Sequence, residues 1–240
     1  VGILLRRSGS SGIVSSRVLA RGFRRGFGLV PTKVWLPNPP AGVMVAGGFD
    51  GSENDDFTAI KLVTVDNLLF TPRYGPDARP TVWNPAEWGG RIPRSEVHAA
   101  WEELADRYKI VRAYCDPGFR DESSWETEIE SWDQLYGPKV FVPWQMSGGN
   151  RIESVYRALK RFEADLDQGK LHHDGCPITT THVGNARKIA KSIDRYGLGK
   201  PSQIQKIDSA VTSVLAWEAA MDAHSAGVFE VPVDEYAYVG

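Results

Sequence analysis

Two apolar runs separated by a polar turn open the patterned part of the chain. Residues 43–49 form an apolar run that ends at Asp50, and residues 58–65 are rich in β-branched side chains. Runs of this length and composition predict two strands paired as a β-hairpin. A third short strand is predicted at residues 68–71, whereas residues 72–90, rich in Trp, Pro and Gly, are predicted to form a loop or insertion.

Helical and strand patterns alternate through the rest of the chain. Apolar residues at helical spacing predict helices, and short apolar runs between them predict strands. The predicted helices cover residues 95–109, 122–136, 152–166, 185–196 and 207–221, and the predicted strands cover residues 109–114, 139–143 and 177–181. This order predicts an α/β fold with a mixed sheet, antiparallel at its start and parallel afterwards, flanked by helices.

The composition is that of a folded domain without a strong net charge or a disulfide framework. With 240 residues, 42% of them hydrophobic, the chain can fill a core, and its formal net charge of −2 excludes a uniformly basic nucleic-acid coat protein. Two cysteines without a CxxC pair fit a reducing compartment and give no structural zinc site. No run is apolar for long enough to predict a membrane span or a signal peptide.

Positive charge is concentrated at the start of the chain. Residues 1–49 hold seven Lys and Arg residues and no Asp or Glu, and they include Gly/Ser and Pro clusters. This composition predicts a basic linker or irregular arm over residues 1–41, followed by a folded domain over residues 42–240. The arm is either a solvated connector or a phosphate contact. Because the first residue is Val1, we expect the chain to be part of a longer polypeptide.

Three aspartates stand at the ends of predicted elements. Asp50 ends the first strand, Asp116 ends the strand after the first helix, and Asp208 begins the last helix. If the two strands are neighbours, their carboxylates emerge at one edge of the sheet, and a helix crossing that edge adds the third. Such a cluster repels itself unless hard divalent cations neutralise it, and oxygen ligands favour Mg²⁺ or Mn²⁺ over zinc. Two such ions can align a phosphodiester for attack by water.

Each aspartate alone also has a purely structural explanation. Asp50-Gly51 and Asp116-Pro117-Gly118 are turn-forming strings, and an acid at Asp208 complements a helix N-terminus. Three further acids, Asp56, Asp121 and Asp174, are candidates for an auxiliary role beside the metals, or else belong to a hairpin, a helix start and a turn. His172, His173 and His182 lack the HExxH spacing, so a zinc site is not expected.

A basic stretch precedes Asp208 in the sequence. Its members are Arg187, Lys188, Lys191, Arg195, Lys200 and Lys206. Because phosphate contacts supply most of the non-specific affinity for DNA, this stretch is predicted to bind the DNA backbone. The alternative is a solvated helix face.

Several short strings occur in a fixed order between residues 42 and 221. They are Gly48-Phe49-Asp50-Gly51-Ser52, Asp56-Phe57-Thr58-Ala59, Tyr114-Cys115-Asp116-Pro117, Trp125 and Trp132 before Tyr136-Gly137, His173-Asp174-Gly175, His182-Val183-Gly184-Asn185-Ala186 and Lys206-Ile207-Asp208. This ordered series resembles the nuclease domain of tailed-bacteriophage terminase large subunits, which is RNase H-like. The resemblance implies a metal-dependent DNA endonuclease of the DNA-packaging motor that uses two divalent cations, Mg²⁺ or Mn²⁺.

The resemblance also implies roles and partners. Asp50 would bridge both ions, Asp116 would bind one of them, and Asp208 would complete the other. The implied partners are double-stranded DNA, the terminase small subunit and the portal, and the implied location is the host-cell cytoplasm, with no membrane. Family members also have an ATPase domain, to which residues 1–41 would connect, but this chain has no GxxxxGK[ST] phosphate loop.

Two other functions stay open on sequence alone. One is another RNase H-like nuclease, of the junction resolvase or transposase type, which branched-DNA preference or strand transfer would reveal. The other is a DNA-gripping or assembly module with a decayed active site, which would bind DNA without cutting it.

Overall fold

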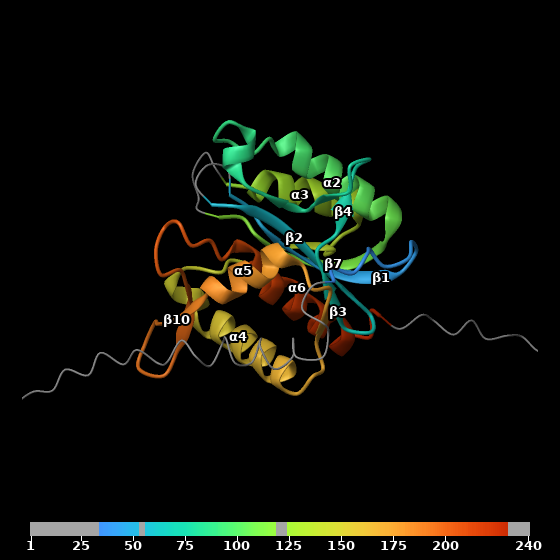
Figure 1. Cartoon of the computed structure of the whole chain (residues 1–240). Coiled ribbons are helices and arrows are strands. Elements are labelled where there is room, and N and C mark those ends of the chain that lie inside the picture. Colours follow the sequence, from blue (N-terminus) through green and yellow to red (C-terminus); the bar gives the residue numbers. More distant parts are fainter. Residues whose placement is uncertain (1–33, 53–55, 119–123, 230–240) are drawn as a thin grey trace, which may run out of the picture.

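Short strands and five α-helices make up the part of the chain that the structure, a computed structural model, describes, namely residues 34–52, 56–118 and 124–229 (Figure 1). The strands are β1 (Met44–Asp50), β2 (Thr58–Thr64), β3 (Leu68–Phe70), β4 (Arg73–Tyr74), β5 (Arg79–Pro80), β6 (Val82–Trp83), β7 (Lys109–Asp116), β8 (Phe141–Pro143), β9 (His172–His173), β10 (Arg187–Ala190) and β11 (Tyr196–Gly199). The helices are α2 (Arg94–Arg107), α3 (Glu126–Tyr136), α4 (Ile152–Asp167), α5 (Pro177–Asn185) and α6 (Asp208–Ser225), with 3₁₀ turns η2 (Pro85–Trp88) and η3 (Gly149–Arg151).

A mixed sheet forms the centre of the molecule. Its strand order is β8-β7-β1-β2-β3-β9, and β6 also pairs with β2. The β1–β2–β3 meander is antiparallel, whereas β7 and β8 add parallel strands beside β1. The predicted mixed sheet, antiparallel first and parallel afterwards, is therefore confirmed.

Helices cover both faces of the sheet. In Figure 1, α2 and α3 lie above the sheet and α4, α5 and α6 lie below it. Alternating side chains of β1 enter two separate cores: Val45 and Phe49 pack with Trp101 of α2, whereas Ala46 packs with Leu215 of α6. This two-sided burial explains why β1 and β2 are apolar runs rather than alternating patterns.

The contact between β1 and α6 is unusually close at Gly48. A Cβ atom added there would lie 2.4 Å from the Ala216 nitrogen and 2.4 Å from the Thr212 oxygen, which are backbone atoms of α6. Only a residue without a side chain lets the helix come so near the strand. Gly48 therefore sets how closely α6 packs against the end of β1.

The pairing of β1 with β7 contains one irregularity. Val45 pairs with Ile110, but the next residue, Ala46, pairs with Arg112, so β7 contains one surplus residue, Val111. From Ala46 onward the register runs without interruption to the last pair of the two strands.

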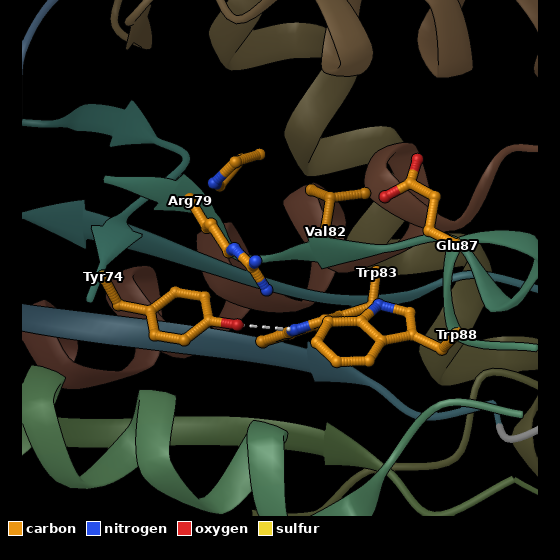
Figure 2. Close-up of a pocket in the computed structure, with 7 residues that line it drawn as sticks. Tyr74, Arg79, Val82, Trp83, Glu87 and Trp88 are labelled. Atoms are coloured by element: carbon orange, nitrogen blue, oxygen red, sulfur yellow. Dashed lines mark hydrogen bonds between the residues drawn. The ribbon is translucent and has the colours of Figure 1, made fainter. Parts of the chain in front are cut away.

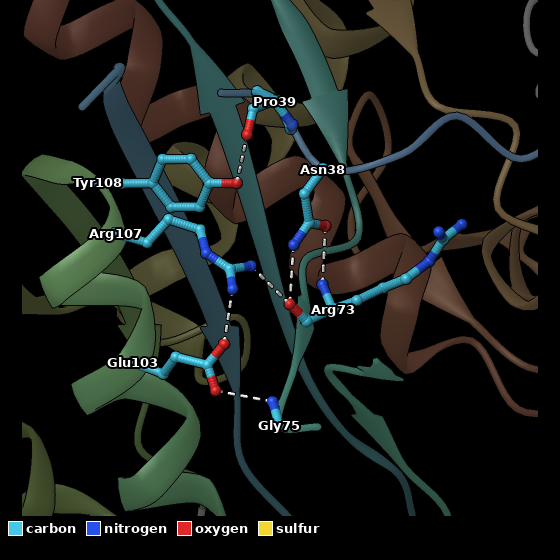
Figure 3. Close-up of polar contacts among 7 residues, drawn as sticks. All are labelled: Asn38, Pro39, Arg73, Gly75, Glu103, Arg107 and Tyr108. Carbon is cyan, nitrogen blue, oxygen red and sulfur yellow. Dashed lines mark hydrogen bonds and ion pairs between the residues drawn. The ribbon is translucent and has the colours of Figure 1, made fainter. Parts of the chain in front are cut away.

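Residues 34–41 lack helix and strand, yet they are anchored on the domain (Figure 3). The Asn38 side chain donates to the Arg73 carbonyl at 2.8 Å and accepts from the Arg73 amide at 2.9 Å. The Tyr108 hydroxyl donates to the Pro39 carbonyl at 3.1 Å. The packed unit therefore includes residues before the predicted boundary at Gly42, while residues 1–33 of the predicted arm lie outside the described residues.

Two predicted elements are wrong. Residues 177–181, predicted as a strand from their β-branched side chains, form the start of α5, because Pro177 suits a first helical turn and the Thr180 hydroxyl bonds back to the Cys176 carbonyl at 3.0 Å. Residues 185–196, predicted as a helix, instead form most of the β10–β11 hairpin. Tyr196 of that hairpin packs edge-on against Tyr156 of α4, at 5.1 Å between ring centroids, so tertiary contact outweighs local helix propensity.

The other predicted elements are confirmed within a few residues of their ends. The insertion at residues 72–90 contains the short strands β4, β5 and β6 and the turn η2. None of the described helices combines the length and hydrophobicity that a membrane crossing requires.

Candidate active site

Asp50 and Asp116 end neighbouring parallel strands at the same position. They are the last pair in the register of β1 and β7, and paired residues of adjacent strands lie about 5 Å apart with side chains on one face. The face is that of α6, because Gly48, two residues before Asp50, packs directly against this helix. The predicted meeting of these two carboxylates at one edge of the sheet is thus what the topology produces.

Asp208 is the first residue of α6, which packs across β1 and β7. Its side chain is buried, with 7% of its surface exposed, and its Oδ2 has no hydrogen-bond partner among the described residues. Burial, and then the negative charge of Asp56, raises the pKa of Asp208 to about 6. A buried carboxylate oxygen without a donor is costly and is the kind of group that a cation satisfies.

Asp50 lies close enough to the other two carboxylates for both to perturb it. Burial raises the pKa of Asp50 well above its usual value, and the charges of Asp116, Asp208 and Asp56 raise it further. Burial also raises the pKa of Asp116, although two backbone amides oppose it: Gly118 donates to Oδ1 at 3.0 Å and Met146 donates to Oδ2 at 3.1 Å. These amides orient Asp116 within the cluster.

The cluster is a set of neighbouring acids and is not a finished coordination shell. Within residues 34–52, 56–118 and 124–229, no three His, Cys, Asp or Glu side chains are arranged to hold a metal ion. The donor set still fits hard divalent cations, since it consists of carboxylate oxygens, one of which is buried without a partner.

Of the two auxiliary candidates within the described residues, Asp56 lies beside the cluster and Asp174 does not. Its Oδ1 accepts from Lys200 at 2.5 Å and from Lys206 at 2.7 Å. Burial opposes ionisation of Asp56, but the two lysines lower its pKa overall, so the carboxylate stays charged. It holds the ammonium groups of Lys200 and Lys206 near Asp50 and Asp208.

Asp174 is engaged elsewhere. Its Oδ2 accepts from the Trp35 indole at 2.9 Å and from the Thr71 amide at 2.8 Å, and its Oδ1 accepts from the Cys176 amide at 3.0 Å. These bonds tie the arm, β3 and α5 together, which is a structural task. Asp121 lies outside the described residues.

The predicted basic stretch is divided by the structure. Lys200 and Lys206 bind Asp56, Lys188 forms a 2.7 Å ion pair with Glu163, and Arg195 is paired with Glu153. Arg187 donates to the Gly184 and Ala186 carbonyls at the end of α5. Lys191, at the exposed tip of the β10–β11 hairpin, has no ion pair within the described residues.

A cavity of about 340 Å³ lies next to Asp116. Met146, whose amide binds Asp116, lines it together with Gly148, Gly149, Lys191 and Tyr196. Sequence patterns gave no sign of this loop, because a backbone amide donates whatever its side chain is.

A second cavity of about 340 Å³ lies on the insertion (Figure 2). Tyr74, Arg79, Trp83 and Trp88 line it, and the Trp83 indole donates to the Tyr74 hydroxyl at 2.9 Å. It contains none of the three aspartates.

Replacing Asp208 by Asn is expected to stabilise the metal-free domain at alkaline pH. The Asp208 pKa is about 6 against an ordinary 3.8, so its ionisation disfavours the folded state. The penalty is absent below pH 4, grows between pH 4 and 6, and levels off above pH 6 at about 3 kcal/mol. Thermal melts in EDTA from pH 4 to 8 should show Asp208→Asn gaining on the parent only as pH rises. A variant less stable than the parent at pH 8 would contradict this.

Comparison with known proteins gives concordant matches. Residues 144–223 match the family model described as the terminase large subunit, endonuclease domain. The Gene 13 proteins of Mycobacterium phages D29 and L5 are 33% and 32% identical to this chain over 193 and 187 residues. These alignments cover 75% and 73% of this chain but 30% and 29% of the relatives, so the chain spans less than a third of their length.

Solved structures share the fold at low sequence identity. The large terminase nuclease of thermophilic phage G20c gives a TM-score of 0.58 at 12% identity, covering 85% of this chain and 98% of that one. The same nuclease with bound magnesium gives 0.57 at 12% identity, covering 83% and 96%. The large terminase of bacteriophage HK97 gives 0.55 at 14% identity, covering 80% and 42%. The predicted RNase H-like fold is confirmed.

Proposed function

This chain carries a nuclease domain of the terminase large-subunit family, and from that premise we propose that it hydrolyses DNA as a divalent-metal-dependent endonuclease. One observation carries the proposal. Asp50 and Asp116 end paired strands on the face that α6 covers, and Asp208, the first residue of α6, has a buried carboxylate oxygen with no donor among the described residues.

In this proposal Asp50, Asp116 and Asp208 would hold two divalent cations, Mg²⁺ or Mn²⁺. When bound, such ions activate water and stabilise the oxygen that leaves a phosphodiester. The chain contributes orientation: the amides of Gly118 and Met146 direct the two oxygens of Asp116. The raised pKa values of Asp50, Asp116 and Asp208 favour the protonated carboxylic acids in metal-free protein. Metal binding would therefore release protons, and the metal affinity would rise with pH.

The substrate in this proposal is double-stranded DNA. Lys200 and Lys206, both held by Asp56, keep positive charge next to the carboxylates, where a phosphate has to approach. The chain would act within a DNA-packaging assembly in the host-cell cytoplasm, with the terminase small subunit and the portal as partners. The alternatives are a junction resolvase, a transposase-type nuclease and a DNA-gripping module that does not cut. The plasmid and junction assays described next distinguish them.

The proposal is tested by nicking of supercoiled plasmid. Purified protein with Mn²⁺ or Mg²⁺ should convert supercoiled plasmid to nicked and linear forms, and EDTA should stop the conversion. In parallel reactions, the protein should not cut four-way junction DNA in preference to the plasmid, and it should not join strand-transfer substrates. Plasmid binding without cutting in either metal would favour the gripping module instead.

Lys191→Ala is expected to weaken DNA binding and reduce the slope of its salt dependence by about 1, because one phosphate contact is lost. Lys188→Ala is the matched control, since Lys188 is 8% exposed and already paired with Glu163. We expect that variant to alter hairpin stability rather than the salt slope. Fluorescence anisotropy on a 30-base-pair duplex across a salt titration measures both; an unchanged Lys191→Ala slope would refute the contact.

A further inference from the structure

The helix that begins with Asp208 lacks a side-chain cap of its own. The residue before it, Ile207, has φ −133° and ψ 1°, and its side chain makes no capping hydrogen bond. Instead the Ser209 amide, in the first turn of α6, donates to Nδ1 of His182 at 3.1 Å. An imidazole from α5 therefore performs the capping that Ser, Thr, Asp or Asn usually performs within the helix itself.

The capping nitrogen of His182 is available at neutral pH. The side chain is buried, with 4% exposed, and packs edge-on against Phe57. Burial, together with the nearby positive charges of Lys61 and Lys206, lowers the pKa of His182 to about 4. The imidazole thus stays neutral above that pH and keeps an acceptor nitrogen.

A second contact holds the same turn of α6. Thr179, three residues before His182 on α5, has its hydroxyl 3.0 Å from the Ser209 hydroxyl. Residues three apart lie on one face of a helix, so α5 presents both groups to Ser209 together.

Lys61 supports this contact from the sheet. Its side chain is 1% exposed, and its ammonium group donates to the hydroxyls of Thr71 and Thr179. Lys61 pairs with Gly48 in the register of β1 and β2, so it lies on the α6 face two positions from the Asp50 pair. A buried ammonium is costly, which favours a specific task over simple filling of the core.

We propose that His182 and Lys61 are positioning residues that act through Ser209 to fix the first turn of α6, and with it the direction of the Asp208 carboxylate. The inference rests on the proposed nuclease function and adds to it. It assigns a role to two residues that touch neither metal nor DNA, and it explains why a helix with an apolar residue at its cap position starts in one defined orientation.

The test compares His182→Ala with His182→Asn in the full 240-residue chain. Asn places its amide oxygen where the imidazole has Nδ1, so it can still accept from Ser209, whereas Ala cannot. We expect His182→Ala to weaken Mn²⁺ binding, followed by electron paramagnetic resonance of free Mn²⁺, about tenfold or more, as is usual for groups that orient metal ligands. We expect His182→Asn to stay within about threefold of the parent, and Lys61→Met to weaken binding as His182→Ala does.

A double-mutant cycle separates positioning from general stability. In an Asp208→Asn background, His182→Ala should change Mn²⁺ affinity less than about twofold, because the group being positioned is gone. Equal losses in both backgrounds, or parental affinity in His182→Ala despite a lower melting temperature, would overturn the positioning proposal alone. A parent chain that binds no Mn²⁺ and cuts no DNA would instead remove the proposed function.

Discussion

Asp50→Asn is expected to lower manganese-dependent nicking by at least about 10³-fold, which corresponds to on the order of 4 kcal/mol of transition-state stabilisation. The reason is its central position. Asp50 pairs with Asp116 in the register of β1 and β7, and burial first, then the charges of Asp116 and Asp208, raise its pKa. The amide keeps the shape of the side chain but has no charge with which to neutralise the cations that the proposed function requires. Asp116→Asn should give a similar loss.

The measurement is the initial rate of plasmid nicking at saturating Mn²⁺. Asp77→Asn, at an exposed position of the insertion, is the matched control and should keep the parental rate. Circular dichroism should show the parental fold for all three variants. Cleavage by Asp50→Asn at a rate near that of the control would contradict the assignment of the site.

Gly48→Ala is expected to destabilise the domain by about 3 kcal/mol or more, since overpacking against rigid backbone leaves no flexible neighbour to move. The new Cβ would meet two backbone atoms of α6 at 2.4 Å, so the helix has to move away from β1. Because α6 carries Asp208, the surviving folded protein should also bind Mn²⁺ more weakly.

Gly47→Ala is the control on the neighbouring position of the same strand. Its Cβ would meet side-chain atoms and no backbone: Leu62 Cδ2 at 3.1 Å, Trp101 Cη2 at 3.3 Å and Ala113 Cβ at 3.4 Å. Side chains can give way by a few tenths of an ångström, so we expect a loss of about 1 kcal/mol. Urea unfolding followed by tryptophan fluorescence measures both changes. A Gly48→Ala variant as stable as Gly47→Ala would show that α6 adjusts its height at little cost.

Sequence patterns predicted the elements whose own residues specify them. The hairpin of β1 and β2 and the amphipathic α4 follow from runs and spacings that no neighbour has to supply. Residues 185–196 show where this fails: their helix-forming side chains join a hairpin because α4 offers Tyr156 and Glu163 to Tyr196 and Lys188. Partners from distant parts of the chain are invisible to a local pattern.

The same division applies to the site. The positions of Asp50, Asp116 and Asp208 at the ends of elements could be predicted from the sequence, since strand ends and helix starts are local features. Their support was not readable, because it consists of the Met146 amide and the His182 ring, which reach the site only through the tertiary fold. His182 did stand out in sequence as a histidine without metal spacing, and its actual partner is a backbone N–H.

The surplus residue in β7 has a consequence for how this domain can evolve. If the register that pairs Val45 with Ile110 continued without a shift, Val111 would pair with Ala46 and Cys115 would lie opposite Asp50. The side chain of Cys115 enters the core formed with α2 and α3. Side-chain orientation inverts with every residue gained or lost in a strand. We therefore expect descendants of this sequence to accept insertions and deletions in the long excursion between β3 and α2, yet almost none between Arg112 and Asp116, where a single codon would turn the acid away from its partner.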